Sequence, residues 1–288
     1  MPKPKVSIPI CTYNHSQFIE RCLKGIAAQR GDFDIEILIG DDCSLDNTRQ
    51  VIQQFASSNP ELNVKLFFRE KNLGPSLNSI LLFRECQGEY IALCDGDDFW
   101  DDETKLQKQL DFLEANKEYS LAYHRISTKI MSKDVRGYCY PEIDGDVLEL
   151  EDAVHQHYIP TVSLVFRASM FELPTWYDDK RMKSGDITIT LLLLCKGPGH
   201  FIREAMAVKR RHKMSLTHSD LFKEHYGNHQ NYTFIFENLD RDSSGKFSAL
   251  FRQRIITHRK GVLLGAIRNG DLKVVFQSIG ILLKYWIK

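Results

Sequence analysis

The chain has 288 residues, of which 43% are hydrophobic and 26% are charged, and its formal net charge is zero. These values are typical of a soluble globular protein with an ample core, built as one large domain or as one domain with an appendage. The chain contains no run of eighteen apolar residues, which excludes a conventional membrane-spanning helix.

The cysteines and the N-terminal segment bear on the compartment. Seven cysteines are scattered along the chain and form no CxxC pair, as is typical of reduced thiols in a cytosolic protein. The N-terminal segment MPKPKVSIPIC has no apolar h-region, so we expect no secretory signal and a cytoplasmic location.

The first half of the chain alternates strand-like and helix-like segments. We expect strands at Val6–Cys11, Asp34–Gly40, Val64–Phe68 and Tyr90–Cys94, followed in turn by helices at about Ser16–Ala28, Asp46–Asn59, Pro75–Cys86 and Lys105–Ala115. This succession predicts an α/β fold with a parallel sheet, whose ligands bind at the carboxyl ends of the strands. Pro9 is unwelcome inside a central strand, so we expect the first strand to start late or to be distorted.

The pattern loosens in the second half. We expect strands at Leu121–Ile126 and Thr161–Phe166, an irregular stretch at Ser132–Asp146, an apolar helix at Asp186–Cys195 and an edge strand at Phe201–His212. From about Ser219 the sequence is typical of helices, with breaks near Ser243–Gly245 and Asn269–Gly270.

Polar residues follow each early strand and can face one pocket. They are Thr12, Tyr13 and Asn14 after the first strand, Asp41 and Asp42 after the second, Asn72 and Gly74 before the third helix, and Asp95, Gly96, Asp97 and Asp98 after the fourth strand. An aromatic ring for stacking, an acid near it, a glycine turn and a set of carboxylates together indicate a nucleotide-diphosphate site.

The carboxylates of the segment EYIALCDGDDFW repel one another unless a cation or a donor-rich ligand lies among them. Oxygen ligands of this kind suit Mg²⁺ or Mn²⁺, which usually bridge to substrate phosphates, and Gly96 lets the backbone come close to the ligand. The alternative is an acidic turn that is merely solvated.

Four motifs in this order, SIPICTYN, DDCSLDNT, NLGPSLNS and GEYIALCDGDDFW, resemble those of the family 2 glycosyltransferases with the GT-A fold. The resemblance spans about Val6 to Trp100, with weaker echoes as far as His212. It implies a GT-A catalytic domain at 1–215, with a nucleotide-sugar half at about 1–125 and an acceptor half at about 126–215. A basic, amphipathic helical C-terminal region would occupy 216–288.

The resemblance also implies roles for single residues. Thr12 and Tyr13 would contact the base of the donor, with Tyr13 stacking on it unless its ring packs on its own helix. Asp42, aided by Asp41, would accept a hydrogen bond from the base, and Asn14 and Gly74 would line the same site. Asn72 is a donor contact or a structural hydrogen-bonding residue.

For the acidic motif, the resemblance implies that Asp97 coordinates the metal. Asp95 would be a second metal ligand, or would hold the ribose or a metal-bound water. Gly96 would adjoin the donor, and Asp98 would orient the surrounding shell or contact the donor sugar. Further along, His212 in VKRRHKMS would be a metal ligand, and Arg210 or Arg211 would neutralise phosphate. Asp186 would be the general base that deprotonates the acceptor, although its position also suits a helix N-cap.

The function expected is that of an inverting transferase dependent on Mn²⁺ or Mg²⁺. It would move a sugar from a nucleotide-diphosphate sugar, a UDP-sugar first of all, to a hydroxyl group of a glycan or lipid-linked glycan. The alternatives are a catalytically silent nucleotide-sugar-binding or membrane-associated scaffold protein and a sugar-phosphate nucleotidyltransferase. The nucleotidyltransferase would need a basic, glycine-rich loop where CTYNHSQF stands.

An excess of positive charge is concentrated at the C-terminal end of the chain. From Gly245 to Lys288, nine Lys or Arg residues stand against one acid, Asp271, so this segment carries +8 and the remainder −8. Its last helix would place the following residues near one apolar face: Val274, Val275, Ile279, Leu282, Leu283 and Trp286. We expect peripheral contact with an anionic membrane surface rather than with nucleic acid, the alternative being ordinary packing on the catalytic domain.

Overall fold

The computed structural model describes residues 4–131, 135–141, 144–155, 159–179, 181–182, 184–212 and 229–286. The domain boundary expected near residue 215 and the helix start expected near Ser219 lie outside the described residues.

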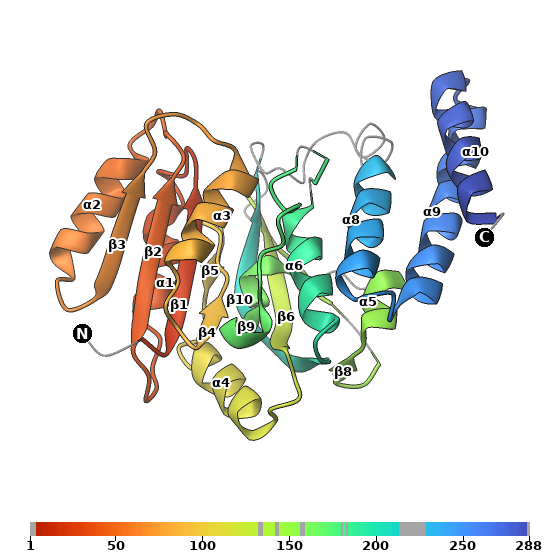
Figure 1. The fold of residues 1–288 in the computed structure, drawn as a ribbon. Helices are drawn as coiled ribbons and strands as arrows, with labels where there is room; N and C mark the ends of the chain where they lie inside the picture. The colour runs from red at the N-terminus through yellow and green to blue at the C-terminus, as the bar shows by residue number, and fades with distance from the viewer. Residues whose placement is uncertain are drawn as a thin grey trace.

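A single mixed sheet runs through the molecule (Figure 1). Within the described residues its strand order is β3-β2-β1-β4-β9-β6-β10-β5, with β7 beside β6 and β8 beside β10. The strands are β1 (Val6–Thr12), β2 (Ile35–Asp41), β3 (Asn63–Phe68), β4 (Tyr90–Ala92), β5 (Phe99–Trp100), β6 (Leu121–Ile130), β7 (Val135–Tyr140), β8 (Val147–Leu148), β9 (Val165–Arg167) and β10 (Gly199–Arg211). Strands β1 to β4 pair in parallel, as do β6 and β10, which confirms the predicted α/β fold.

The helices pack on the sheet and at its far end. They are α1 (Ile19–Ala27), α2 (Thr48–Ser58), α3 (Pro75–Glu85), α4 (Lys105–Ala115), α5 (Leu150–His155), α6 (Gly185–Leu194), α8 (His229–Asp242), α9 (Ser248–Arg268) and α10 (Leu272–Trp286). The breaks predicted after α8 and α9 are confirmed. Gly245 and Gly270 stand there with φ angles of 79° and 70°, which glycine adopts without strain.

The alternation of side chains along the strands creates two cores, one on each face of the sheet. Around β4, Ile91 and Leu93 join the cluster that contains α3 and α6, whereas Ala92 and Cys94 join the cluster that contains α1 and α4. This central strand is therefore buried on both faces, and the residues that follow it emerge at the carboxyl edge of the sheet.

Pro9 does not distort the first strand, contrary to our expectation. β1 pairs with β2 along its whole length, and the pairing of β1 with β4 ends where Ser7 meets Ile91. The carbonyl of Lys5 accepts a hydrogen bond from the Tyr90 amide, so the odd-numbered residues of β1 face β4. An N–H at position 9 would point toward β4, beyond the last paired residue on that side. Its absence in Pro9 therefore costs no hydrogen bond.

Three predictions for the second half are wrong. Thr161–Ser163 is a 3₁₀ turn, and the strand β9 begins only at Val165. The stretch expected to be irregular contains β7. The expected edge strand, β10, lies inside the sheet between β6 and β5, because thirteen residues are long enough to pair with both and also with β8.

The last helix differs from the expectation in which face it exposes. Val274, Val275 and Leu282 are partly buried, whereas Ile279 and Leu283 are exposed. No helix within the described residues has both the length and the apolar character that crossing a bilayer requires. The side chain of Trp286 lies outside the described residues.

One buried carboxylate joins three strands at the amino end of the sheet. Glu36 of β2 is fully buried and accepts hydrogen bonds from Ser7 Oγ at 2.5 Å, from the Gln87 amide at 2.7 Å and from Lys65 Nζ at 2.8 Å. Burial opposes ionisation, but the bonds from Lys65, Ser7 and Gln87 outweigh it and hold the pKa of Glu36 below its usual value.

We predict that Glu36→Gln lowers the free energy of unfolding at pH 7 by about 2 kcal/mol, because it leaves the Lys65 ammonium without its partner. Since the folded-state pKa of Glu36 is depressed, its contribution is present above pH 4.5 and is lost as the pH falls through the folded value. The difference between the two proteins should therefore shrink in acid. Urea unfolding at several pH values measures this, with Glu89→Gln, which breaks an exposed pair with Lys5, as a control that changes less than about 1 kcal/mol. Equal stabilities at pH 7 would contradict the role of Glu36.

Candidate active site

The loops that follow β1 and β2 are tied to each other by side-chain hydrogen bonds. The amide of Asn14 donates to Ser44 Oγ at 2.9 Å, and Asn14 Oδ1 accepts from the Leu45 amide at 2.8 Å. Asn14 itself has a φ of 55°, a left-handed conformation that asparagine tolerates better than most residues. The turn at Asn14 directs the next residue, His15, toward the acidic motif, and the His15 amide is held by Thr48 Oγ1 at 2.8 Å.

Asp41 and Asp42 both hold neighbouring loops in place. Asp41 is fully buried and accepts from Arg49 Nε and from the amide and hydroxyl of Ser44. Asp42 accepts from the amides of Leu73 and Gly74 at 2.7 and 2.8 Å. Each carboxylate oxygen can accept more than one hydrogen bond, so Asp42 keeps acceptor capacity for a ligand, whereas Asp41 is largely engaged within the protein.

The remaining donor-site residues lie around these carboxylates. Asn72 Nδ2 donates to the Asp42 carbonyl at 3.2 Å, and Gly74, with a φ of 84°, precedes α3 with open space in front of it. Thr12 is buried, and its carbonyl accepts from the Asp42 amide at 2.9 Å. The ring of Tyr13 is 40% exposed, so it is accessible to a flat ligand.

Gly96 brings the acidic motif against the end of β1. Its amide donates to the Cys11 carbonyl at 3.0 Å. A Cβ at this position would lie 2.9 Å from both Cβ and Oγ1 of Thr12 and 3.0 Å from His15 Nδ1. Only glycine fits between these groups without displacing them, and this contact sets how closely the carboxylates approach the first loop.

Asp97, His15 and His212 form a compact group of candidate metal ligands. His212 Nε2 lies 3.0 Å from Asp97 Oδ2, and one ligand atom from each of the three residues lies within 4.8 Å of the others. The ring of Phe18 stacks on His212 with a centroid separation of 4.5 Å and holds it in place. Asp95, which was predicted to be a ligand, is not part of this group.

The donor set fits a divalent transition-metal ion. Burial lowers the pKa of His15, so its imidazole is neutral at pH 7, the form that binds a metal. Its Nδ1 is buried without a hydrogen-bond partner among the described residues. Two imidazoles and one carboxylate suit Mn²⁺ better than Mg²⁺, which prefers oxygen ligands only.

The carboxylates of the acidic motif differ in their electrostatics. Burial, together with the charge of Asp97, raises the pKa of Asp95 to about 7, and burial with the charges of Asp97 and Asp95 raises the pKa of Asp98. Burial also opposes the ionisation of Asp97, but the hydrogen bond with His212 and the nearby His15 hold its pKa below the usual value. Crowded acids of this kind favour a cationic ligand.

The end of β10 supplies positive groups to this cluster. Asp98 Oδ1 accepts from the Arg210 amide at 2.8 Å. The Arg210 guanidinium donates to the Phe18 and Asp97 carbonyls, so it braces the motif instead of facing outward. The positive charge of Lys209 partly offsets the rise in the pKa of Asp95 and of Asp98. Lys209 was not among the site residues predicted from the sequence. Arg211 is partly buried at the last position of the strand.

Asp186 lies in the first turn of α6, whose N-cap is Ser184, so the N-cap alternative for Asp186 is wrong. Its carboxylate accepts from the amide of the next residue, Ile187, at 2.8 Å. The pKa of Asp95 depends mainly on burial and on the charges of Asp97 and Lys209. The negative charge of Asp186 has a smaller effect, which raises this pKa. Asp186 therefore lies close enough to Asp95 for the two negative charges to repel each other.

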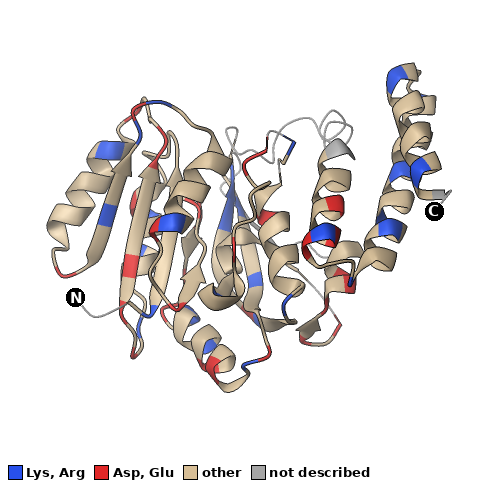
Figure 2. Cartoon of the chain, viewed as in Figure 1, with Lys and Arg blue, Asp and Glu red and all other residues tan. Residues whose placement is uncertain are grey.

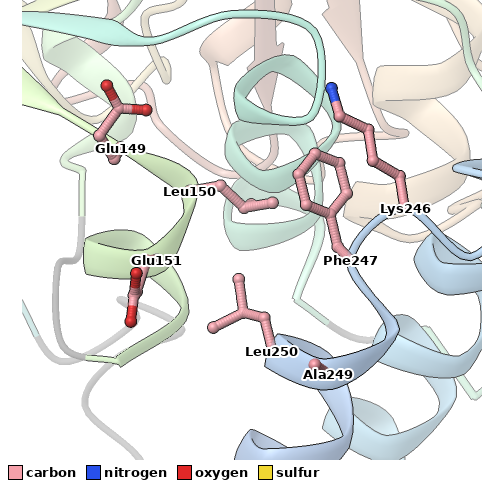
Figure 3. A pocket seen from close by; sticks show the side chains of 7 residues that line it. All are labelled: Glu149, Leu150, Glu151, Lys246, Phe247, Ala249 and Leu250. Carbon is pink, nitrogen blue, oxygen red and sulfur yellow. The ribbon is translucent and has the colours of Figure 1, made fainter.

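A cavity of about 410 Å³ lies between α5 and the start of α9 (Figure 3). Leu150, Phe247 and Leu250 line it, with Glu149 and Lys246 on opposite walls. None of the predicted site residues lines this cavity, and it is separate from the acidic motif.

Comparisons with known proteins bear on the family and the fold. Residues 7–171 match the family model described as glycosyl transferase family 2. An uncharacterized protein of Mycobacterium tuberculosis is 31% identical over 223 residues, covering 74% of this chain and 61% of that protein. The chain thus spans about three fifths of the length of this curated relative.

Two solved structures share the fold. Staphylococcus aureus TarS 1–349 in complex with UDP-GlcNAc has a TM-score of 0.62 at 16% identity, covering 95% of this chain and 90% of that one. The mannosyltransferase PcManGT from Pyrobaculum calidifontis, in complex with GDP-Man and Mn²⁺, has a TM-score of 0.58 at 16% identity, covering 99% of this chain and 81% of that one.

We predict that Gly96→Ala lowers the free energy of unfolding by about 1–3 kcal/mol, because the added methyl group overpacks the contact with Thr12 and His15. Gly261→Ala in α9 is the matched control: its methyl group meets no atom within 4 Å, and alanine favours the helix by about 1 kcal/mol. Chemical denaturation of both variants measures the difference. A Gly96→Ala protein as stable as the wild type would show that the motif does not approach β1 this closely.

Proposed function

The chain belongs to glycosyl transferase family 2, and on this premise we propose that it transfers a sugar from a nucleotide-diphosphate sugar to a hydroxyl group of a glycan or lipid-linked glycan. The observation that carries the proposal is the meeting of the acidic motif with His15 and His212 beside the ends of β1 and β2. The place is the one where α/β sheets bind nucleotides.

The donor would lie across the ends of β1, β2 and β4. Tyr13 stacks on the base, Thr12 and Asn14 border it, and Asp42 accepts a hydrogen bond from its N–H edge. Asn72 and Gly74 shape the loop beside it, and Asp95 holds the ribose while Asp98 orients the motif. The exposed ring of Tyr13 and the remaining acceptor capacity of Asp42 support this placement, and Asp41 serves by fixing the loop. A UDP-sugar is the donor we propose to test first, in keeping with UDP-GlcNAc in TarS.

His15, Asp97 and His212 would hold Mn²⁺ in preference to Mg²⁺, and the structure of PcManGT is a complex with GDP-Man and Mn²⁺. Such an ion supplies positive charge that stabilises the leaving diphosphate. On the protein side, Phe18 orients His212, Arg210 braces the Asp97 backbone, and Lys209 and Arg211 add positive charge from the end of β10.

Asp186 would be the general base. It removes the proton from the acceptor hydroxyl as that oxygen attacks the anomeric carbon opposite the diphosphate, and the configuration is inverted. Its position in the first turn of α6 and its electrostatic influence on Asp95 support a placement facing the donor. Among the described hydrogen bonds, the Asp186 carboxylate accepts one, from the Ile187 amide to Oδ1. Its Oδ2 takes part in none of these bonds.

We predict that His15→Gln and Asp97→Asn each lower the affinity for Mn²⁺ by about tenfold to a hundredfold or more, since even indirect supports of a metal ligand cost that much. Isothermal titration calorimetry with MnCl₂ alone measures the affinity without any turnover. His155→Gln, at the end of α5, is the control and should bind like the wild type. Retention of full affinity by both site variants would place the metal elsewhere.

We predict that Asp186→Asn reduces transfer by about 10²–10⁴-fold while the affinity for the nucleoside diphosphate stays within about twofold, because the residue faces the acceptor. Product formation from a panel of nucleotide sugars with Mn²⁺ tests the turnover, and calorimetry with the diphosphate tests binding. Asp178→Asn, on the exposed loop before α6, controls for the loss of one negative charge. A variant that loses nucleotide affinity and keeps its turnover would refute the role of general base.

A further inference from the structure

Helices α9 and α10 form an antiparallel hairpin at the edge of the molecule remote from α2 (Figure 1). Both helices of this hairpin expose large apolar side chains, with exposed fractions from 40% to 69%. They are Leu264, Ile267, Leu272, Phe276, Ile279 and Leu283. On α10 the four members are spaced by four, three and four residues, so they form one stripe along the helix. We call the part around the turn, Leu264 to Phe276, the hairpin tip.

The stripe is exposed because the other face of α10 is the one that packs. Arg252 Nε of α9 donates to the Tyr285 carbonyl at 3.0 Å. Glu237 of α8 accepts from Lys284 Nζ and from Tyr285 Oη, both at 2.6 Å. These bonds fix the orientation of α10, so its apolar stripe cannot turn inward without breaking them.

The charged residues at the hairpin tip are mostly basic. Arg268 and Lys273 are exposed on either side of the turn, and Lys260 is exposed two turns before it on α9. The single acid of the hairpin, Asp271, accepts from the Val274 amide at 3.1 Å and so serves the start of α10. Figure 2 shows basic segments along both helices.

The direction of the hairpin relates the tip to the candidate active site. Its turn lies at the same end of the molecule as the carboxyl ends of β2 and β3 (Figure 1). A flat surface that meets the tip would therefore meet the end of the molecule at which the donor and acceptor are proposed to bind.

We propose that the hairpin tip docks on an anionic bilayer, with Leu272 and Phe276 entering the interface and Arg268 and Lys273 contacting anionic headgroups. Exposed apolar side chains flanked by cations on a helical hairpin fit an interfacial site. A second copy of the chain meeting the same surface would bring like charges together, and carboxylates that could offset them are scarce on the hairpin. The complementary charge lies on the lipid.

The experiment uses the full chain and vesicles of pure phosphatidylcholine or of phosphatidylcholine with about one third phosphatidylglycerol. Deleting α10 would also remove the bonds of Arg252 and Glu237, so point substitutions are the better probe. The wild type should co-sediment with the anionic vesicles, bind the neutral ones much less and dissociate at high salt. Leu272→Gln/Phe276→Gln should lower the partition coefficient at least tenfold. Arg268→Gln/Lys273→Gln should lower it about thirtyfold on anionic vesicles, at roughly 1 kcal/mol for each cation.

Two matched controls separate the tip from general effects. Val147→Gln removes an exposed apolar side chain from β8, and Lys24→Gln/Arg30→Gln removes two exposed cations near α1. Both should bind like the wild type. In Phe276→Trp, the indole emission should shift to the blue when anionic vesicles are added, and circular dichroism checks that each variant is folded.

Several results would overturn the proposal. They are absence of binding by the wild type, equal binding to both kinds of vesicle, and tip variants that bind like the wild type. A wild-type dimer that the tip variants convert to a monomer would instead assign the surface to a second copy. No donor, acceptor or metal enters this experiment, so its failure leaves the proposed transfer reaction untouched.

Discussion

The structure depends on one electrostatic constraint: three carboxylates at the end of a buried strand cannot be accommodated alone. Asp95, Asp97 and Asp98 follow β4, which is covered on both faces, and burial makes their mutual repulsion more costly. Groups from the surrounding elements offset this negative charge. β1 delivers His15, and β10 delivers Lys209, the Arg210 amide and His212. Residues more than a hundred positions apart are thereby brought to one point.

Much of the first half could be predicted from sequence because its information is local. Strand and helix periods and a proline in the first turn of α3 act within a few residues, and they predicted the parallel sheet. The resemblance to family 2 glycosyltransferases implied that Asp97 and His212 belong to one metal site, and the two side chains do meet, at 3.0 Å. The position of Asp186 on α6 was predicted as well. The helix begins at Gly185, however, whereas an N-cap at Asp186 would require it to begin at Ile187.

The errors arise where the outcome depends on distant partners. The identification of His15 required knowing that Asn14 takes a left-handed conformation and that Thr48 holds the next amide, and neither is visible in the letters CTYNHSQF. The only signal in the sequence was that His15 directly follows the motif SIPICTYN. Likewise β10, predicted to be an edge strand with a basic end, lies between β6 and β5, and the charge of its Lys209 acts on Asp95 and Asp98. On α10 an apolar pattern could not tell which side meets α9, since both sides carry apolar residues.

The buried carboxylate of Glu36 has a consequence for how the sheet assembles. In the observed alignment Glu36 stands beside Ser7 on one side and Asn63 on the other. Sliding β2 by one residue would turn the carboxylate to the opposite face, among the isoleucines, and would bring Ile35 or Ile37 to the polar position. Runs of isoleucine and valine alone would tolerate several alignments almost equally. A single charged side chain thus makes one alignment unique, and the strand ends that carry the site residues are level with one another for that reason.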